Sequence, residues 1–191
     1  PECQEAFEKL KTALTTAPVL VLPQFIKPFI LTTDASITGI AYILSQKDDG
    51  GREHVVSYGG RGLRPPETRW TISEIEMLAI IEGVSNYHVY LAGNEFQIFT
   101  DHISLTFLNK MRLGVNNRLT RWALYMQRYR YKIAYKKGST LTAADCLSRL
   151  PRPDDYEPLI ENDPLGDSVV YTFSTDDRPI SRTIIQFDTD T

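Results

Sequence analysis

The chain has 191 residues, of which 42% are hydrophobic and 24% are charged, and this composition indicates one globular domain with extensions. No run approaches the roughly 18 apolar residues that a membrane helix needs, and nothing resembles a signal peptide, so we expect no membrane association. The two cysteines, Cys3 and Cys146, have no metal-ligand spacing, which argues against a structural zinc site. The start at Pro1 rather than Met indicates a fragment or a processed product.

The formal net charge of −3 is unevenly distributed along the chain. Residues 1–100 carry 8 Lys and Arg against 12 acids, a net charge of −4. Residues 101–153 carry 11 Lys and Arg against 2 acids, a net charge of +9, and residues 154–191 have a net charge of −8. The positive block predicts a surface that faces phosphates, with a solvated helix face as the alternative.

The first 27 residues are expected to form a helix and an extended connector. Acids occupy the first turns of residues 2–16, where they favour a helix, and Pro18 ends it. The connector is bracketed by Pro23 and Pro28. The apolar positions of the helix are Cys3, Phe7, Leu10 and Leu14.

Three strands are expected to follow as an antiparallel meander. The runs 28–34, 39–46 and 54–58 are predicted strands, and the turn signal at 48–51 separates the second strand from the third. Residues 59–66 are rich in Gly and Pro and are expected to form a loop.

A long helix has a clear predicted start. Thr71 and Glu74 fit a capping box, and Trp70 and Ile75 occupy the two positions of a hydrophobic staple. The helix is expected to run to about Leu91, and Gly93 is a natural C-cap.

Helices and strands are expected to alternate from residue 96 to residue 150, and the composition then becomes acidic and rich in Pro. A strand at 96–100 ends at Asp101, and Thr142 is a predicted N-cap. The chain is therefore divided into a segment at 1–27, a domain at 28–150 and a largely irregular acidic tail at 151–191. The further elements are helices at 102–109, 116–129 and 142–150, and a strand at 131–135.

This order of elements predicts an α/β fold with a five-stranded mixed sheet, three strands antiparallel and then two parallel, flanked by helices. The first and fourth strands would be adjacent and parallel, joined by a long crossover. Asp34 and Asp101 would then end neighbouring strands at the carboxyl edge, where open α/β sheets bind ligands.

Four carboxylates are candidates for one site at this edge, and each also has a structural alternative. Asp34 could cap a turn, Asp101 could cap the following helix, and Asp145 lies where an acid favours a helix dipole. Glu76 could be a solvated helix residue. Glu74 competes with it for the site, but Glu74 is already used in the capping box, so we favour Glu76.

Each of these carboxylates lies in a short sequence motif, and the four motifs occur in the following order along the chain. They are Thr33–Ser36, Glu76–Ile80, Thr100–His102 and Ala144–Arg149. Together they resemble the ribonuclease H domain of gypsy-type (Metaviridae) LTR-retrotransposon reverse transcriptases. Residues 3–7 and 17–20 resemble the join between the polymerase and ribonuclease H parts of that family, so residues 1–27 would be a connection segment.

The resemblance implies a ribonuclease H-like fold for residues 28–150. It also implies that Asp34, Glu76, Asp101 and Asp145 are the catalytic, metal-binding acids. Hard oxygen ligands favour two Mg²⁺ ions, for which Mn²⁺ can substitute. The implied reaction is endonucleolytic hydrolysis of the RNA strand of RNA/DNA hybrids during reverse transcription, with 5′-phosphate products.

The resemblance also implies partners and substrate contacts. A polymerase domain would lie upstream in the same polyprotein and integrase downstream, in the cytoplasm within virus-like particles. Contacts to 2′-hydroxyls would distinguish RNA from DNA, and basic side chains would hold phosphates. The candidates for the first role are Ser36, Arg61 and Asn109, and those for the second are Arg118, Arg121 and Arg128.

Two other functions compete with this hypothesis. A non-catalytic ribonuclease H-like module would bind nucleic acid or a polymerase partner, but it would not need all four acids. A DNA-cutting transferase of related fold, such as an integrase, is disfavoured by the missing zinc-binding His and Cys residues and by the fourth acid at Asp145.

Overall fold

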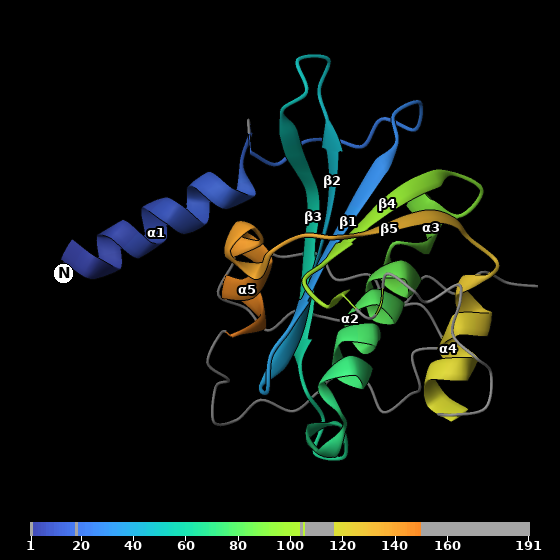
Figure 1. Cartoon of the computed structure of the whole chain (residues 1–191). Helices are drawn as coiled ribbons and strands as arrows, with labels where there is room; N and C mark the ends of the chain where they lie inside the picture. The colour runs from blue at the N-terminus through green and yellow to red at the C-terminus, as the bar shows by residue number, and fades with distance from the viewer. Residues whose placement is uncertain (1, 18, 104, 106–116, 150–191) are drawn as a thin grey trace, which may run out of the picture.

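A computed structural model describes residues 2–17, 19–103, 105 and 117–149 and shows a five-stranded mixed sheet with strand order β3-β2-β1-β4-β5 (Figure 1). The strands are β1 (Phe29–Ala35), β2 (Gly39–Lys47), β3 (Glu53–Gly62), β4 (Glu95–Thr100) and β5 (Arg130–Tyr135). The α-helices are α1 (Glu2–Thr15), α2 (Ile72–Asn86), α3 (His88–Leu91), α4 (Asn117–Met126) and α5 (Thr142–Ser148). Two short 3₁₀ helices are η1 (Glu67–Arg69) and η3 (Gly138–Thr140).

The strand pairing confirms the predicted topology. β1 pairs antiparallel with β2 and parallel with β4, and β4 pairs parallel with β5. In the parallel register Thr32 lies opposite Phe99. Asp34 and Asp101 each follow two residues later, so both reach the same edge of the sheet.

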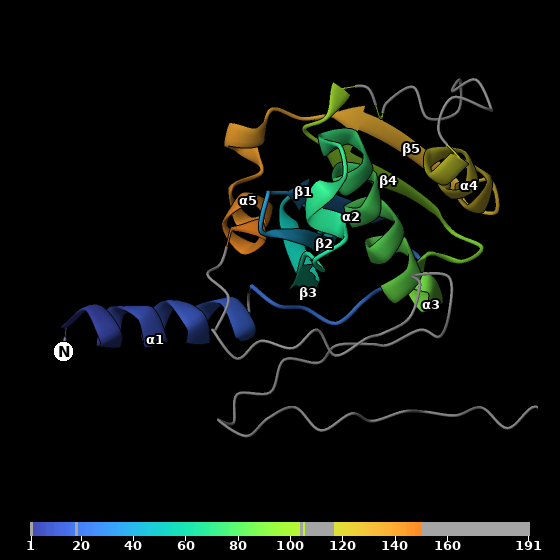
Figure 2. The same cartoon turned by 90° about the horizontal axis from the view of Figure 1, so that it is seen from below.

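The main core lies between the sheet and the helices α2 and α4. Buried apolar side chains of β1, β2 and β4 pack there against α2, whose residues 74–84 are all buried. The helix α5 lies across the strands β1 to β3 from α2, on the other side of the sheet (Figure 2). The carboxyl edge of the sheet is therefore enclosed by one helix from each side.

The start of α2 confirms the predicted capping box. The Thr71 hydroxyl accepts a hydrogen bond from the Glu74 amide, and the Glu74 carboxylate accepts one from the Thr71 amide at 2.9 Å. The helix ends at Asn86, earlier than expected, because Tyr87 leaves the helical conformation and α3 follows separately. Gly93 has a φ of +79°, as a C-cap glycine requires.

The helix α1 projects away from the rest of the domain (Figure 1). It forms where the spacing of Phe7, Leu10 and Leu14 predicts, yet these side chains are 57%, 66% and 49% exposed. None of the residues of α1 is buried against the described part of the chain. Within the described residues, no helix is long and apolar enough to span a membrane.

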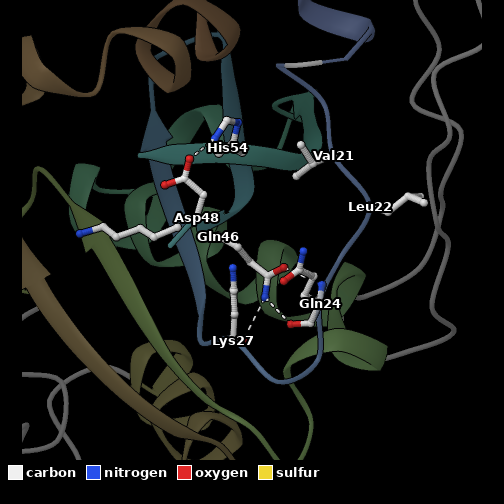
Figure 3. Close-up of a pocket in the computed structure, with 8 residues that line it drawn as sticks. Val21, Leu22, Gln24, Lys27, Gln46, Asp48 and His54 are labelled. Atoms are coloured by element: carbon white, nitrogen blue, oxygen red, sulfur yellow. Dashed lines mark hydrogen bonds and ion pairs between the residues drawn. The ribbon is translucent and has the colours of Figure 1, made fainter. Parts of the chain in front are cut away.

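The connector after α1 is attached to the sheet by backbone and side-chain hydrogen bonds. Val21 donates its amide to the Val55 carbonyl at 2.8 Å, so the connector runs along β3. The side chain of Gln46 accepts from the Gln24 amide and donates to the carbonyls of Gln24 and Lys27, each at 2.8 Å (Figure 3). Gln24, Lys27 and Gln46 are among the residues that line a hollow of about 160 Å³, which lies at the end of β2 remote from Asp34.

Two local expectations are wrong. The strand β3 continues through Gly59 and Gly60 to Gly62, where the sequence predicts a loop. The helix α5 begins at Thr142 itself, with Leu141 as the N-cap and no side-chain cap. The predicted helix at 102–109 falls mostly outside the described residues, and the tail at 151–191 lies outside them entirely.

The glycines of β3 are needed because neighbouring atoms occupy the space of a side chain. A Cβ atom on Gly60 would lie 2.6 Å from the carbonyl oxygen of Ile40 and 3.2 Å from Cα of Ala41, both backbone atoms of β2. A Cβ atom on Gly59 would collide with the buried ring of Tyr42. The glycines therefore keep β3 close to β2 instead of ending the strand.

Replacing Gly60 by Ala is expected to lower the free energy of unfolding by about 1–3 kcal/mol, because the added methyl group meets backbone that cannot move aside. Urea titration followed by circular dichroism measures the change. Gly50→Ala in the exposed turn is the control, with an expected change within about 0.5 kcal/mol. A Gly60→Ala protein as stable as its parent would contradict the continuation of β3.

Candidate metal centre

Three acids from three separate elements meet at the carboxyl edge of the sheet. Asp34 is the penultimate residue of β1, Asp101 follows β4 directly, and Glu76 lies in the second turn of α2. One carboxylate oxygen of each lies within 4.8 Å of the others. Three of the four predicted acids are thus brought together, with a spacing that a divalent cation can bridge.

Burial makes this group unfavourable without a counter-charge. Asp34 and Glu76 are only 2% and 4% exposed. Desolvation, together with the charges of Asp101 and Asp34, raises the pKa of Glu76 to about 9. Desolvation also raises the pKa of Asp34, against a lowering by its hydrogen bond from Ser148. Ionising Asp34 and Glu76 together is therefore unfavourable unless a cation lies beside them.

One oxygen of the group has no partner among the described residues. The buried Oε2 atom of Glu76 receives no hydrogen bond from the described residues. In a folded protein nearly all buried polar atoms are satisfied, so this oxygen is open to a ligand. Its neighbours are carboxylate oxygens, which are the donors that Mg²⁺ and Mn²⁺ prefer, so the residues fit such an ion.

Glu74 is oriented away from the acid group, as the capping box predicts. Its Oε2 atom accepts from the amide and hydroxyl of Thr71, each at 2.9 Å. Its Oε1 atom accepts from Arg118 at 2.7 Å. Both oxygens are engaged, which leaves Glu76 as the glutamate of the site.

Asp145 lies beside the acid group and not in it. It is part of α5, and its Oδ1 atom accepts a hydrogen bond from Nε of Arg149 at 2.6 Å. Its charge still contributes to raising the pKa of Asp34. The structure therefore joins Asp34, Glu76 and Asp101, with the fourth predicted acid close by in an ion pair of its own.

Comparison with known proteins shows the family to which the chain belongs. Residues 1–98 match the family model described as the RNase H-like domain found in reverse transcriptase. The chain belongs to this family. It is 40% identical over 148 residues to the Pol polyprotein of transposon opus, and 35% identical over 188 residues to that of transposon gypsy, both from Drosophila melanogaster. These alignments cover 77% and 93% of the chain but only 15% and 17% of the polyproteins.

Solved structures share the fold of this RNase H-like domain. A foamy viral protease-reverse transcriptase in complex with double-stranded DNA has a TM-score of 0.58 at 18% identity, over 71% of this chain and 26% of that one. The same viral enzyme in complex with an RNA/DNA hybrid has a TM-score of 0.52 at 20% identity, over 83% of this chain and 21% of that one. The shared fold thus spans about a quarter or less of each viral chain.

Ser148 fastens Asp34 of the candidate metal centre to α5, a role that the sequence motifs alone did not indicate. Its hydroxyl donates to Oδ2 of Asp34 at 2.6 Å and to the carbonyl of Asp145 at 3.0 Å. Its own carbonyl accepts from the Ser36 hydroxyl at 2.6 Å. Ser36, a predicted substrate contact, therefore uses its hydroxyl to fasten the β1–β2 turn to α5.

Arg61 is also occupied inside the domain, which corrects its prediction as a substrate contact. It is only 9% exposed. Its guanidinium donates to the Glu67 carboxylate at 2.7 and 2.8 Å and to the Glu82 carboxylate at 2.7 and 3.1 Å. An arginine engaged in this way is not available to a ligand at the surface. It ties the end of β3 to η1 and α2.

The basic residues predicted to hold phosphates differ in their surroundings. Arg118 pairs with Glu74 at 2.7 Å, and its guanidinium lies 3.8 Å from the centre of the Trp70 ring. Arg121 is exposed, and so is Arg128, which lies over the Tyr125 ring. Asn109 lies outside the described residues. Among the three arginines predicted to hold phosphates, Arg121 and Arg128 are therefore the two whose side chains are exposed to solvent.

The raised pKa of Glu76 predicts how the metal-free domain responds to pH. Below the ordinary value of 4.5 Glu76 is protonated in both folded and unfolded states, and its contribution to stability is fully present. That contribution is lost as the pH rises from about 4.5 through about 9, because only the unfolded state ionises freely in that range. We expect the free energy of unfolding in EDTA to fall across this window, by at most about 1.4 kcal/mol per pH unit for one group.

Glu76→Gln is expected to flatten this dependence, because the amide carries no ionisable proton. Urea titrations at several pH values measure the slope, and Glu8→Gln on the exposed face of α1 is the control that keeps it. Mn²⁺ should restore the stability of the parent near pH 8 more than that of Glu76→Gln. Equal slopes for parent and Glu76→Gln would contradict the buried, protonated carboxyl.

Proposed function

We propose that this RNase H-like domain is an endoribonuclease that hydrolyses the RNA strand of RNA/DNA hybrids during retrotransposon reverse transcription. The observation that carries the proposal is the convergence of Asp34, Glu76 and Asp101, together with the unpartnered buried oxygen of Glu76. The family assignment and the similarity to a viral reverse transcriptase that was solved with an RNA/DNA hybrid support the same substrate.

The acids would hold two Mg²⁺ ions, with Mn²⁺ as a substitute. Asp34, Glu76 and Asp101 would supply the main ligands, and Asp145 would complete the set from α5. When bound, such a pair of ions lowers the pKa of the attacking water and stabilises the leaving 3′ oxygen, which gives 5′-phosphate and 3′-hydroxyl ends. Ser148 fixes one oxygen of Asp34 by its hydrogen bond, and burial keeps bulk water away from Glu76.

The basic surface would position the hybrid through its phosphates. We define the basic surface as the exposed cations of α4, β5 and the residues next to them. They are Arg121, Arg128, Arg130, Lys132 and Lys137. Phosphate contacts fix the register and orientation of a nucleic acid but do not read its sequence.

The domain would act as one part of a polyprotein. The curated relatives are Pol polyproteins of which the chain spans about a sixth. We expect a polymerase domain upstream in the same polypeptide and integrase downstream, in cytoplasmic virus-like particles. The exposed apolar face of α1 offers the upstream part a place to pack.

Asp34→Asn is expected to reduce cleavage of a labelled RNA/DNA hybrid in Mg²⁺ by at least about 100-fold, because a ligand is lost where even an outer-shell partner costs 10–100-fold. Labelling each strand in turn shows whether the RNA alone is cut, and circular dichroism shows that the fold is kept. Asp49→Asn, an exposed acid in the β2–β3 turn, is the control that retains activity.

Two outcomes would overturn the nuclease assignment. Either the parent domain binds the hybrid without cutting it, which indicates the non-catalytic module, or Asp34→Asn cuts as fast as the parent. A parent that cuts the DNA strand as well as the RNA strand would change the substrate class.

Arg121→Gln and Arg128→Gln are each expected to weaken hybrid binding and to lower the slope of log K against log salt concentration by about 1, since each removes one phosphate contact. Fluorescence anisotropy between low and moderate salt measures the slope. Arg52→Gln, an exposed arginine paired with Asp48 at the opposite end of the sheet, is the matched control. Unchanged slopes in both variants would remove α4 from the interface.

A further inference from the structure

Asp145 and Arg149 form an ion pair at the end of α5, next to the metal centre. The Nε atom of Arg149 lies 2.6 Å from Oδ1 of Asp145, four residues earlier in the chain. Both side chains reach solvent, at 64% exposed for Arg149 and 41% for Asp145. An exposed pair of this kind contributes little to stability, so it can open at small cost.

The backbone that carries the pair is fixed to the acid group. Ser148 lies between the two residues and is buried, and its hydroxyl bonds both to Asp34 and to the Asp145 carbonyl. Ser36 holds the Ser148 carbonyl from the other side. Because the helix end is anchored, Asp145 and Arg149 can change partners by side-chain rotation alone.

The guanidinium of Arg149 also acts on the acids of the centre. Desolvation raises the pKa of Asp34, and the charges of Asp101 and Asp145 add to that rise, while the charge of Arg149 offsets a small part of it. In return, the acids Asp145, Asp34 and Asp101 raise the pKa of Arg149. Arg149 therefore offsets part of the negative charge that a divalent cation would otherwise neutralise.

We propose that Arg149 is an exchangeable counter-cation of the metal centre. It competes with divalent cations for Asp145, whose carboxylate it contacts at 2.6 Å, and it releases Asp145 to the group when cations bind. The freed guanidinium then lies at the same edge of the sheet, where it takes a phosphate of the nucleic-acid backbone in the forked geometry that arginine provides. This positioning role rests on the proposed function of the centre.

Arg149→Gln is expected to shift two affinities in opposite directions. Mn²⁺ should bind about threefold to tenfold more tightly, because a competing positive charge is removed. The RNA/DNA hybrid should bind about threefold to tenfold more weakly, because a phosphate contact is lost. Isothermal titration calorimetry measures the first and fluorescence anisotropy in Ca²⁺ the second. A purely structural role would weaken both affinities together.

Three further variants sharpen the test. Arg149→Lys keeps the charge and should hold Mn²⁺ affinity within about twofold of the parent. Arg52→Gln removes a matched i,i+4 arginine from its pair with Asp48, far from the centre, and should change neither affinity. In an Asp145→Asn background, Arg149→Gln should tighten Mn²⁺ binding less than in the parent, because the shared partner is absent.

The proposal is overturned if Arg149→Gln binds Mn²⁺ no more tightly than the parent, or if its hybrid affinity is unchanged. Both readouts are binding measurements that do not depend on cleavage. If the parent binds Mn²⁺ and hybrid but does not cut the RNA strand, the proposed nuclease function fails while the exchange at Arg149 stands. If the parent cuts and the two affinities do not diverge, the exchange alone fails.

Discussion

Parallel pairing between β1 and β4 is the constraint on which the candidate metal centre depends. It fixes Asp34 and Asp101 at one edge of the sheet, and the crossover that parallel strands require supplies α2 with Glu76. The oxygens of Asp34, Glu76 and Asp101 come within 4.8 Å of one another, so the helix and the two strands meet at the site itself. The positions of the three acids therefore follow from the sheet topology. Packing of the hydrophobic core keeps their carboxylates close together although their charges repel one another.

Much of this arrangement follows from local signals in the sequence. The turn at 48–51, the capping box at Thr71 and Glu74, and the alternation of apolar segments are short-range patterns, and they predict the sheet order correctly. The capping box also separates Glu74 from Glu76, because one carboxylate cannot cap the helix and face the sheet. The convergence of the three acids is predictable as well, because the predicted sheet order places Asp34 and Asp101 at one edge and the capping box points to Glu76 as the third acid.

Other features depend on partners that are distant in sequence. The glycines at 59 and 60 have the composition of a loop, and only the Tyr42 ring and the β2 backbone explain why they form a strand. The role of Arg61 is hidden in the same way, because its partner Glu82 is 21 residues away. The pairing of Asp145 with Arg149 is different, because two opposite charges spaced i,i+4 on a helix are neighbours, and this spacing alone indicates an ion pair.

The connector along β3 has a consequence for where the folding unit begins. β3 is the outermost strand of its side of the sheet, and the backbone of residues 19–21 takes up the hydrogen-bonding groups of Val55. An open strand edge of this kind is a template for pairing with another chain. The connector thus covers part of the exposed edge of β3. A protein trimmed to the start of β1 would keep the acids of the candidate metal centre, yet it would expose an edge strand that can pair with another chain and aggregate.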